Sequence, residues 1–315
     1  MRIVFMGTPD YVVPILGKLL EAGHQIPAVY TRPDQRAGRG KKMVPPPVKA
    51  FAEARAMPIY QPVSLGSRKV IQELIEIAPE AIVVAAYGRI LPAAILRIPP
   101  LGVLNIHPSL LPRYRGPSPV IQAIVDGLAT TGVTVMFLDE GMDTGPVIAQ
   151  RETDVGPKET GGELRQRMFE MGADILVDLL PNLESSAVQA AQQDCSGATL
   201  TRLYKKEDGE VDWDLPAVQI ERMIRAFDPW PGCYTSWGKK TLKLISADTK
   251  TAEITSLPGS IIGLEEEGRR SVCVATGSGL LQLRRVQLEG RRPQDIDEFC
   301  RGYPQFLGGI LTARS

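Results

Sequence analysis

The segment from Ala81 to His107 reads AIVVAAYGRILPAAILRIPPLGVLNIH and contains two short apolar runs, residues 81–86 and 102–106. Their length and aliphatic composition are typical of strands that are buried on both faces. Two earlier apolar runs, residues 3–6 and 26–30, are separated by a helix-like pattern. This alternation predicts an α/β fold with a Rossmann-like parallel or mixed sheet and helical crossovers.

The rest of the chain divides into a continuation of this pattern and a region of different character. Residues 132–138 and 146–150 favour a strand and its return, and residues 163–180 favour a helix that Thr160 caps. Beyond residue 240 the strand-like runs are short and broken by glycine and charge, which predicts a small antiparallel barrel or sandwich. We therefore expect a catalytic domain at 1–188, a linker at 189–206 and a barrel domain at 207–315.

Composition excludes several classes of protein. The 315 residues contain 36 Lys or Arg and 36 Asp or Glu, so a globally basic nucleic-acid binder is not indicated. The four cysteines lack zinc-ligand spacing, and neither dinucleotide nor P-loop motifs occur. No signal peptide or apolar run of about 20 residues is present. We expect a cytoplasmic protein with no metal and no membrane segment, and a monomer as the default.

Three polar residues stand at predicted strand ends. Asn105 and His107 are two apart, so on an extended backbone their side chains share one face. Asp143 lies in a loop between Gly141 and Gly145, which permit tight turns near a ligand. A lone histidine is often only a structural hydrogen bonder, so the surrounding sequence decides its interpretation.

That surrounding sequence is distinctive. NIHPSLLP at residues 105–112, followed by RYRG, and DEGMDTG at 139–145 resemble the signatures of the folate-dependent formyltransferases. The resemblance implies 10-formyltetrahydrofolate as formyl donor and Asn105, His107 and Asp143 as catalytic residues. Asn105 suits an oxyanion donor, and His107 a second donor or a proton shuttle. Asp143 either orients and charges His107 or accepts the proton of the nucleophile, directly or through water.

The resemblance also implies which residues bind the folate. Leu110 and Leu111 are equally suited to core packing, and we expect both roles to apply in part. The implied folate-binding residues are Tyr87, Gly88, Ile90, Ser109, Leu110, Leu111, Pro112, Asp139 and Gly141.

A basic loop, TRPDQRAGRGKK at residues 31–42, follows the second predicted strand. Glycines alternate with basic residues in this loop, so its backbone can adapt and bring the cationic side chains to the phosphates of a nucleic acid. It resembles the insertion with which family members that act on aminoacylated tRNA hold the acceptor end, so initiator methionyl-tRNA is the implied partner. The implied tRNA-binding residues are Arg32, Arg36, Arg39, Lys41 and Lys42.

The last third carries a weaker signal. Residues 206–213 and 225–232 resemble the start of the C-terminal domain of these same members, which implies an OB-like β-barrel that helps to hold the tRNA. Residues 205–315 nevertheless hold 16 basic and 16 acidic residues, so this domain is not net basic. Alternative enzymes are a formyltransferase for an amino-sugar nucleotide and a formyltetrahydrofolate hydrolase, against which the basic loop argues. The non-enzymatic alternative is a folate- or RNA-binding protein on a degenerate scaffold, against which the intact trio argues.

Overall fold

The computed structural model describes residues 1–37, 42–183, 189–252, 256–266 and 269–313. The chain forms two compact units. The first comprises residues 1–119, 130–154 and 165–201, and the second comprises residues 120–129, 155–164 and 202–315. Each unit is built from three separate segments, whereas the sequence predicted one continuous segment for each domain. The predicted domain boundaries stay a prediction. Residues 189–201, expected within the linker, belong to the first unit.

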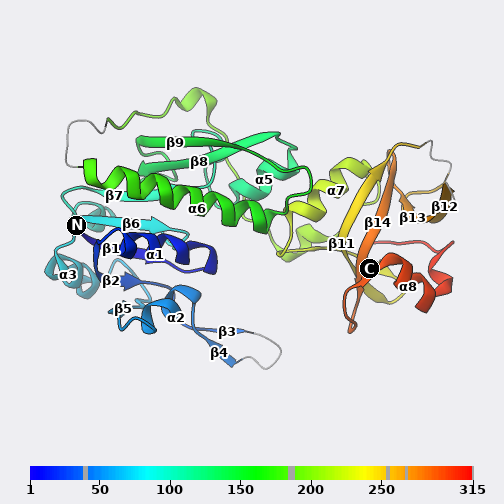
Figure 1. Ribbon diagram of the computed structural model, residues 1–315, viewed down its shortest axis with the longest axis horizontal. Helices are drawn as coiled ribbons and strands as arrows, with labels where there is room; N and C mark the ends of the chain where they lie inside the picture. The colour runs from blue at the N-terminus through cyan, green and yellow to red at the C-terminus, as the bar shows by residue number, and fades with distance from the viewer. Residues whose placement is uncertain (38–41, 184–188, 253–255, 267–268, 314–315) are drawn as a thin grey trace. The chain divides into compact units, whose positions relative to one another are not determined.

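A seven-stranded sheet in the order β5-β2-β1-β6-β7-β8-β9 forms the centre of the first unit (Figure 1). The strands are β1 (Arg2–Gly7), β2 (Gln25–Tyr30), β5 (Ile59–Tyr60), β6 (Ala81–Ala85), β7 (Val103–His107), β8 (Thr130–Phe137) and β9 (Val147–Asp154). The five strands from β5 to β7 are parallel, whereas β8 and β9 each run antiparallel to their neighbour. The predicted mixed sheet is thereby confirmed.

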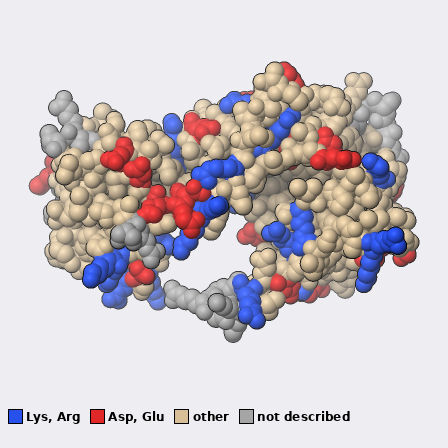
Figure 2. Space-filling view, turned by 180° about the vertical axis from the view of Figure 1, so that it is seen from behind, with Lys and Arg blue, Asp and Glu red and all other residues tan. Residues whose placement is uncertain are grey.

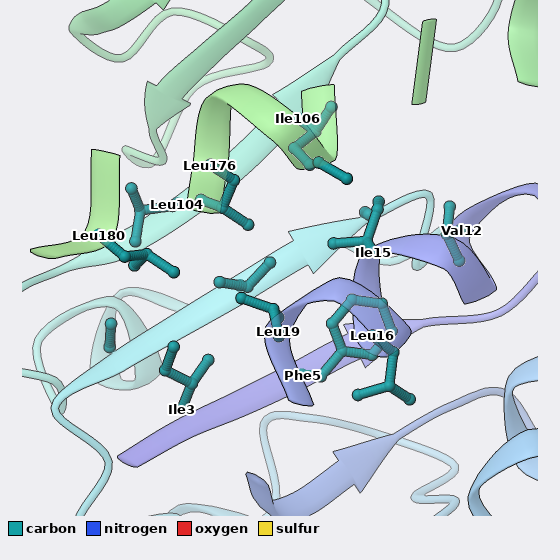
Figure 3. Close-up of a cluster of buried hydrophobic side chains, with 14 of the residues drawn as sticks. Ile3, Phe5, Val12, Ile15, Leu16, Leu19, Leu104, Ile106, Leu176 and Leu180 are labelled. Carbon is teal, nitrogen blue, oxygen red and sulfur yellow. The ribbon is translucent and has the colours of Figure 1, made fainter. Parts of the chain in front are cut away.

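Alternate side chains of each central strand enter two different cores. Ile3 and Phe5 of β1 pack with α1 (Val13–Glu21) and α6 (Gly161–Leu179) on one face, as Figure 3 shows. Val4 and Met6 pack on the other face with α3 (Arg68–Ile77) and α4 (Ala93–Leu96). Because both faces are covered, β6 and the part of β1 after Arg2 contain no polar side chain. Burying each such side chain stabilises the fold by about 1.5–3 kcal/mol.

Local signals place the helix ends. Thr160 and Glu163 form a reciprocal capping box at the start of α6, in which each side chain accepts a hydrogen bond from the backbone of the other. This confirms the predicted cap. Several further elements were not expected from the sequence; most are too short to show a periodic pattern, whereas α3 is amphipathic over ten residues. They are the hairpin strands β3 (Gln35–Ala37) and β4 (Lys42–Val44), and the helices α2 (Pro47–Glu53), α3, α4 and α5 (Pro119–Val125).

The second unit is an antiparallel sheet in the order β10-β11-β14-β13-β12. Residues 308–312 hydrogen-bond to Ser236 of β10 at one edge and to Gly259 and Ile261 beside β12 at the other, so this segment joins the two edges. The predicted barrel-like domain is confirmed. Its elements are α7 (Ala217–Ala226), β10 (Cys233–Trp237), β11 (Lys240–Lys250), β12 (Ile261–Glu266), β13 (Arg269–Ala275), β14 (Leu280–Leu288), β15 (Gln294–Asp295) and α8 (Ile296–Gly302).

The surface carries charges of both signs (Figure 2). Basic and acidic side chains are interspersed over the face that Figure 2 shows, in keeping with the net charge of zero. Within the described ranges, none of the helices is both long enough and apolar enough to cross a membrane.

Candidate active site

The carboxyl end of β7 presents Asn105 and His107 on the face opposite the α1–α6 core. Their neighbours Leu104 and Ile106 point into that core, so strand alternation directs the two polar residues to the other side. His107 is buried and Asn105 is half-buried. Among the described residues, the side-chain amide of Asn105 has no hydrogen-bond partner, which leaves its N–H groups available to a ligand.

The imidazole of His107 is oriented by the backbone. Its Nε2 lies 2.9 Å from the carbonyl oxygen of Tyr114. Because a carbonyl oxygen only accepts hydrogen bonds, Nε2 carries a proton, and in the neutral ring Nδ1 therefore has the free lone pair. Nδ1 lies 3.7 Å from Oδ2 of Asp143, a separation at which protonation of His107 creates an ion pair.

Asp143 reaches this position from the loop that follows β8. Its backbone has φ of 54°, a left-handed conformation that costs a non-glycine residue about 1 kcal/mol or more. The backbone N–H of Gly116 donates a 2.7 Å hydrogen bond to Oδ2 of Asp143. Gly145 is required for steric reasons, because a Cβ there would lie 1.9 Å from the carbonyl oxygen of Phe137. The structure thus brings together all three residues of the predicted trio.

The segment Ser109–Pro112 is fixed by a polar network on β8 and β9. Thr134 donates a 2.6 Å hydrogen bond to the carbonyl of Ser109 and accepts a 3.2 Å hydrogen bond from the N–H of Leu111. Gln150 donates to the carbonyl of Leu111 at 2.8 Å and to Thr134 at 2.9 Å. The sequence did not indicate that Thr134 and Gln150 hold this segment, because both are far from it along the chain.

The side chains of this segment are largely used within the protein. The hydroxyl of Ser109 is fully buried and donates to the carbonyl of Arg113 at 2.7 Å. Leu111 is buried. Leu110 packs against Gly132 so closely that a Cβ added to Gly132 would lie 2.4 Å from a methyl carbon of Leu110. The expected packing role is therefore confirmed for Leu111, whereas Leu110 is only half-buried.

The loops after β1, β2 and β6 meet beside β7. Thr8 donates to the carbonyl of Tyr87 at 3.3 Å, and Arg32 donates to the carbonyl of Gly88 at 3.1 Å. Tyr87 is buried, its hydroxyl has no partner in the described residues, and burial raises its pKa. Ile90, by contrast, is 88% exposed. These loops lie at the sheet edge where parallel α/β folds bind ligands.

The remaining two predicted folate-binding residues lie in the loop that holds Asp143. One carboxylate oxygen of Asp139 accepts hydrogen bonds from the N–H of Gly141 at 3.0 Å and from the hydroxyl of Thr144 at 2.7 Å. Asp139 therefore stabilises the turn itself.

The basic loop forms the antiparallel hairpin β3–β4, in which Arg36 is exposed and pairs with Met43. Arg39 and Lys41 lie outside the described residues, and Lys42 begins β4. Its one acid, Asp34, accepts hydrogen bonds from Lys49 at 2.8 Å and from Gln61 at 2.8 Å. The hydrogen bond from Lys49 lowers the pKa of Asp34. This carboxylate is thus paired with a cation from outside the loop.

Comparison with known proteins agrees with this geometry. Residues 1–180 match the family model "Formyl transferase", and residues 204–304 match "Formyl transferase, C-terminal domain". The chain is 49% identical to methionyl-tRNA formyltransferase of Chloroflexus aurantiacus, over 96% of this chain and 97% of the relative. It is 43% identical to methionyl-tRNA formyltransferase of Marinobacter nauticus, over 98% of both chains.

A solved structure supports the fold. HypX from Aquifex aeolicus in complex with tetrahydrofolic acid aligns with a TM-score of 0.64 and 19% identity, over 100% of this chain and 48% of that chain. The two family models together cover most of the sequence, and the relatives match it nearly end to end. The chain therefore belongs to the formyl transferase family.

Proposed function

We propose that the chain transfers the formyl group of 10-formyltetrahydrofolate to the amino group of methionine on initiator methionyl-tRNA. The observation that carries the proposal is the convergence of Asn105, His107 and Asp143 at one sheet edge. The 49% identical relative is a methionyl-tRNA formyltransferase, which supports the choice of acceptor. The product would serve translation initiation in the cytoplasm.

Formyl transfer develops negative charge on the formyl oxygen when the amine attacks the carbonyl carbon. The unpartnered amide of Asn105 supplies an N–H donor for that oxygen. Such a donor stabilises the transition state more than the ground state, and removing one typically costs about 10²–10³ in turnover. A half-buried position excludes part of the competing water.

His107 is the proton carrier of the proposed reaction. In its neutral form Nδ1 accepts the proton of the attacking amine, and it returns the proton to the folate nitrogen when the carbon–nitrogen bond breaks. The carboxylate of Asp143, 3.7 Å from Nδ1, stabilises the imidazolium that exists between these steps. Because Nε2 stays bonded to Tyr114, the ring does not need to turn.

The folate donor is assigned to the loops around the trio. The segments at Gly88, Gly141 and Ser109–Pro112 would border the polar ring of the folate, while exposed Ile90 supplies apolar surface. The side chain of Tyr87 is buried in the core on the α3–α4 face, so Tyr87 would support the loop that borders the folate. Asp139 would act by holding its turn.

The basic loop is assigned to the phosphates of the acceptor arm. Arg36 is exposed, and Asp34 is neutralised by Lys49, so the positive charge of the loop is not cancelled internally. We assign Arg39, Lys41 and Lys42 the same role. Arg32 would link this loop to the folate site through Gly88. An enzyme for a small amino-sugar nucleotide has no need for such a loop.

A formylation assay tests the proposal directly. Labelled 10-formyltetrahydrofolate is supplied with charged initiator tRNA, and label is followed into acid-precipitable RNA. We expect transfer that weakens steeply with salt, because each released phosphate counterion contributes to the salt dependence. Folate hydrolysis without transfer, or transfer only to an amino-sugar nucleotide, would refute it.

Variants of the loop separate the two substrates. Arg36→Ala and Arg39→Ala are expected to raise KM for tRNA several-fold without changing hydrolysis of the donor. Arg68→Ala, which removes an exposed arginine at the start of α3, is the matched control and is expected to behave as wild type. An equal loss of transfer and hydrolysis would contradict the proposed tRNA contact.

A further inference from the structure

Gln193 lies between the two family models, which end at residue 180 and begin at residue 204, yet its side chain reaches the candidate active site. Its Nε2 donates to the carbonyl of Asp143 at 2.9 Å and to the carbonyl of Gly145 at 2.8 Å. Its Oε1 accepts from Nε of Arg115 at 3.1 Å and from a terminal nitrogen of Arg115 at 2.8 Å. Both donors and both acceptor positions of the amide are therefore used.

The two carbonyls that this amide binds belong to the loop that orients the catalytic carboxylate. Asp143 holds a left-handed backbone, and Gly145 is pressed against Phe137. Such a conformation persists only where surrounding contacts fix it. An amide that bridges residues 143 and 145 provides that fixation directly.

The other end of Gln193 fixes the opposite side of the site. Arg115 is buried and precedes Gly116, whose N–H donates to the carboxylate of Asp143. One side chain therefore holds both the backbone of Asp143 and the residue next to the donor that orients its carboxylate. Replacing it would release both constraints on the distance between Asp143 and Nδ1 of His107.

Gln193 is itself held in place by backbone pairing on both sides. Ala191 pairs with Val147 through two hydrogen bonds of 2.8 Å. Thr199 and Thr201 pair with Arg115 at 2.9 and 2.8 Å. This segment is a fixed part of the first unit, so its amide is presented in a defined position.

We propose that Gln193 is a positioning residue for formyl transfer, which acts through Asp143 and does not touch the substrates. The inference rests on the proposed function. It assigns a role in the reaction to the segment between the two family domains. A displacement of about 1 Å at a reacting group can cost about 100-fold in rate.

The first test compares two adjacent glutamines. Gln193→Ala is expected to lower kcat for formyl transfer by about 10- to 100-fold, with KM for tRNA and folate changed less than about twofold. Gln192→Ala is the control, because Gln192 is exposed and makes no side-chain hydrogen bond within the described residues. A Gln193→Ala enzyme with wild-type kcat would overturn the inference.

An isosteric variant protects the test against simple misfolding. Gln193→Glu keeps the acceptors for Arg115 but places a carboxylate oxygen against the two carbonyls. We expect a similar loss of kcat in a protein that remains folded by its far-ultraviolet spectrum, because Arg115 pairs with the new carboxylate. Full activity of Gln193→Glu would show that the two donated hydrogen bonds are not needed, and would refute the inference even if Gln193→Ala failed to fold.

A double-mutant cycle distinguishes positioning from an independent effect. If Gln193 acts through Asp143, then Gln193→Ala is expected to change the residual single-turnover rate of Asp143→Ala by less than about twofold. Multiplying losses would overturn the inference. Hydrogen exchange of residues 139–145 should accelerate in Gln193→Ala and not in Gln192→Ala, a readout that needs no activity.

The outcomes also separate this inference from the proposed function. Wild-type protein that fails to formylate methionyl-tRNA would refute the proposed function, whatever the exchange data show. Wild-type protein that formylates normally, together with a fully active Gln193→Ala, would refute only the role of Gln193.

Discussion

Replacing Thr134 with valine tests whether β8 supports the candidate folate site through one buried hydroxyl. Thr134 is fully buried, and valine has nearly the same shape, so packing changes little. The hydroxyl donates to the carbonyl of Ser109 and accepts from the N–H of Leu111 and from Gln150. The substitution removes all three hydrogen bonds while leaving their partners in place.

The expected loss follows from the groups left unpaired. A buried donor or acceptor without a partner costs about 1–3 kcal/mol. Gln150 keeps its bond to the carbonyl of Leu111, so the carbonyl of Ser109 and the N–H of Leu111 bear most of the cost. We expect a destabilisation of about 2–3 kcal/mol, which for a unit of this size lowers Tm by about 5–10 °C.

Thermal unfolding of the purified variant, followed by circular dichroism, measures this loss, and KM for the folate donor should rise at the same time. Thr130→Val is the control, because Thr130 is an exposed residue of the same strand with no side-chain hydrogen bond in the described part of the chain. A Thr134→Val protein that loses less than about 0.5 kcal/mol, or no more than Thr130→Val, would refute this reasoning.

Four further substitutions test other parts of the structure. Asn105→Ala and His107→Ala should each lower kcat by about 10²–10³ with the far-ultraviolet spectrum unchanged, and near-normal turnover in either would contradict their proposed roles. Gly145→Ala places a Cβ 1.9 Å from a backbone oxygen, so kcat should fall together with Tm, and a fully active variant would show that the loop adapts. The pKa of Asp208 is lowered to about 2, chiefly by its hydrogen bonds from Arg202. Because the pKa of Asp208 is lower in the folded protein than the unfolded value near 3.8, its ion pair stabilises the fold at pH values above 3.8. This stabilisation is lost as the pH falls toward about 2. Asp208→Asn should therefore lower Tm at pH 7 but not below pH 2, and a difference that persists at acid pH would exclude this ion pair as the cause.

Much of the first unit was predictable because its strands are buried on both faces. The apolar runs at residues 3–6, 26–30, 81–86 and 102–106 each coincide with an observed strand. The β3–β4 hairpin and the helices α2, α4 and α5 were missed, because elements of three to seven residues are too short to show a repeating pattern. Helix α3 was missed although its ten residues are amphipathic. The first strand of the barrel, β10, was missed as well, since its polar residues interrupt the pattern.

The candidate trio was identified by local motifs, while its geometry came from the fold. The spacing of Asn105 and His107 guarantees that they share one face of a strand. That Nε2 of His107 is used by Tyr114 depends on how the chain turns after β7. The same turn places the N–H of Gly116 on Asp143, and no sequence pattern reports either contact.

The sequence by itself determined the periodic core of the first unit, the family motifs and the positions of the three polar residues, since these depend on neighbours along the chain. Only the tertiary structure decided which atoms face one another. Gln193 and Asp143 are 50 residues apart, and a hydrogen bond across that separation exists only after the sheet has formed. Residues 189–206 contain neither a periodic pattern nor a motif, so the sequence predicts a linker there. The contacts that give Gln193 its role are all with residues distant along the chain.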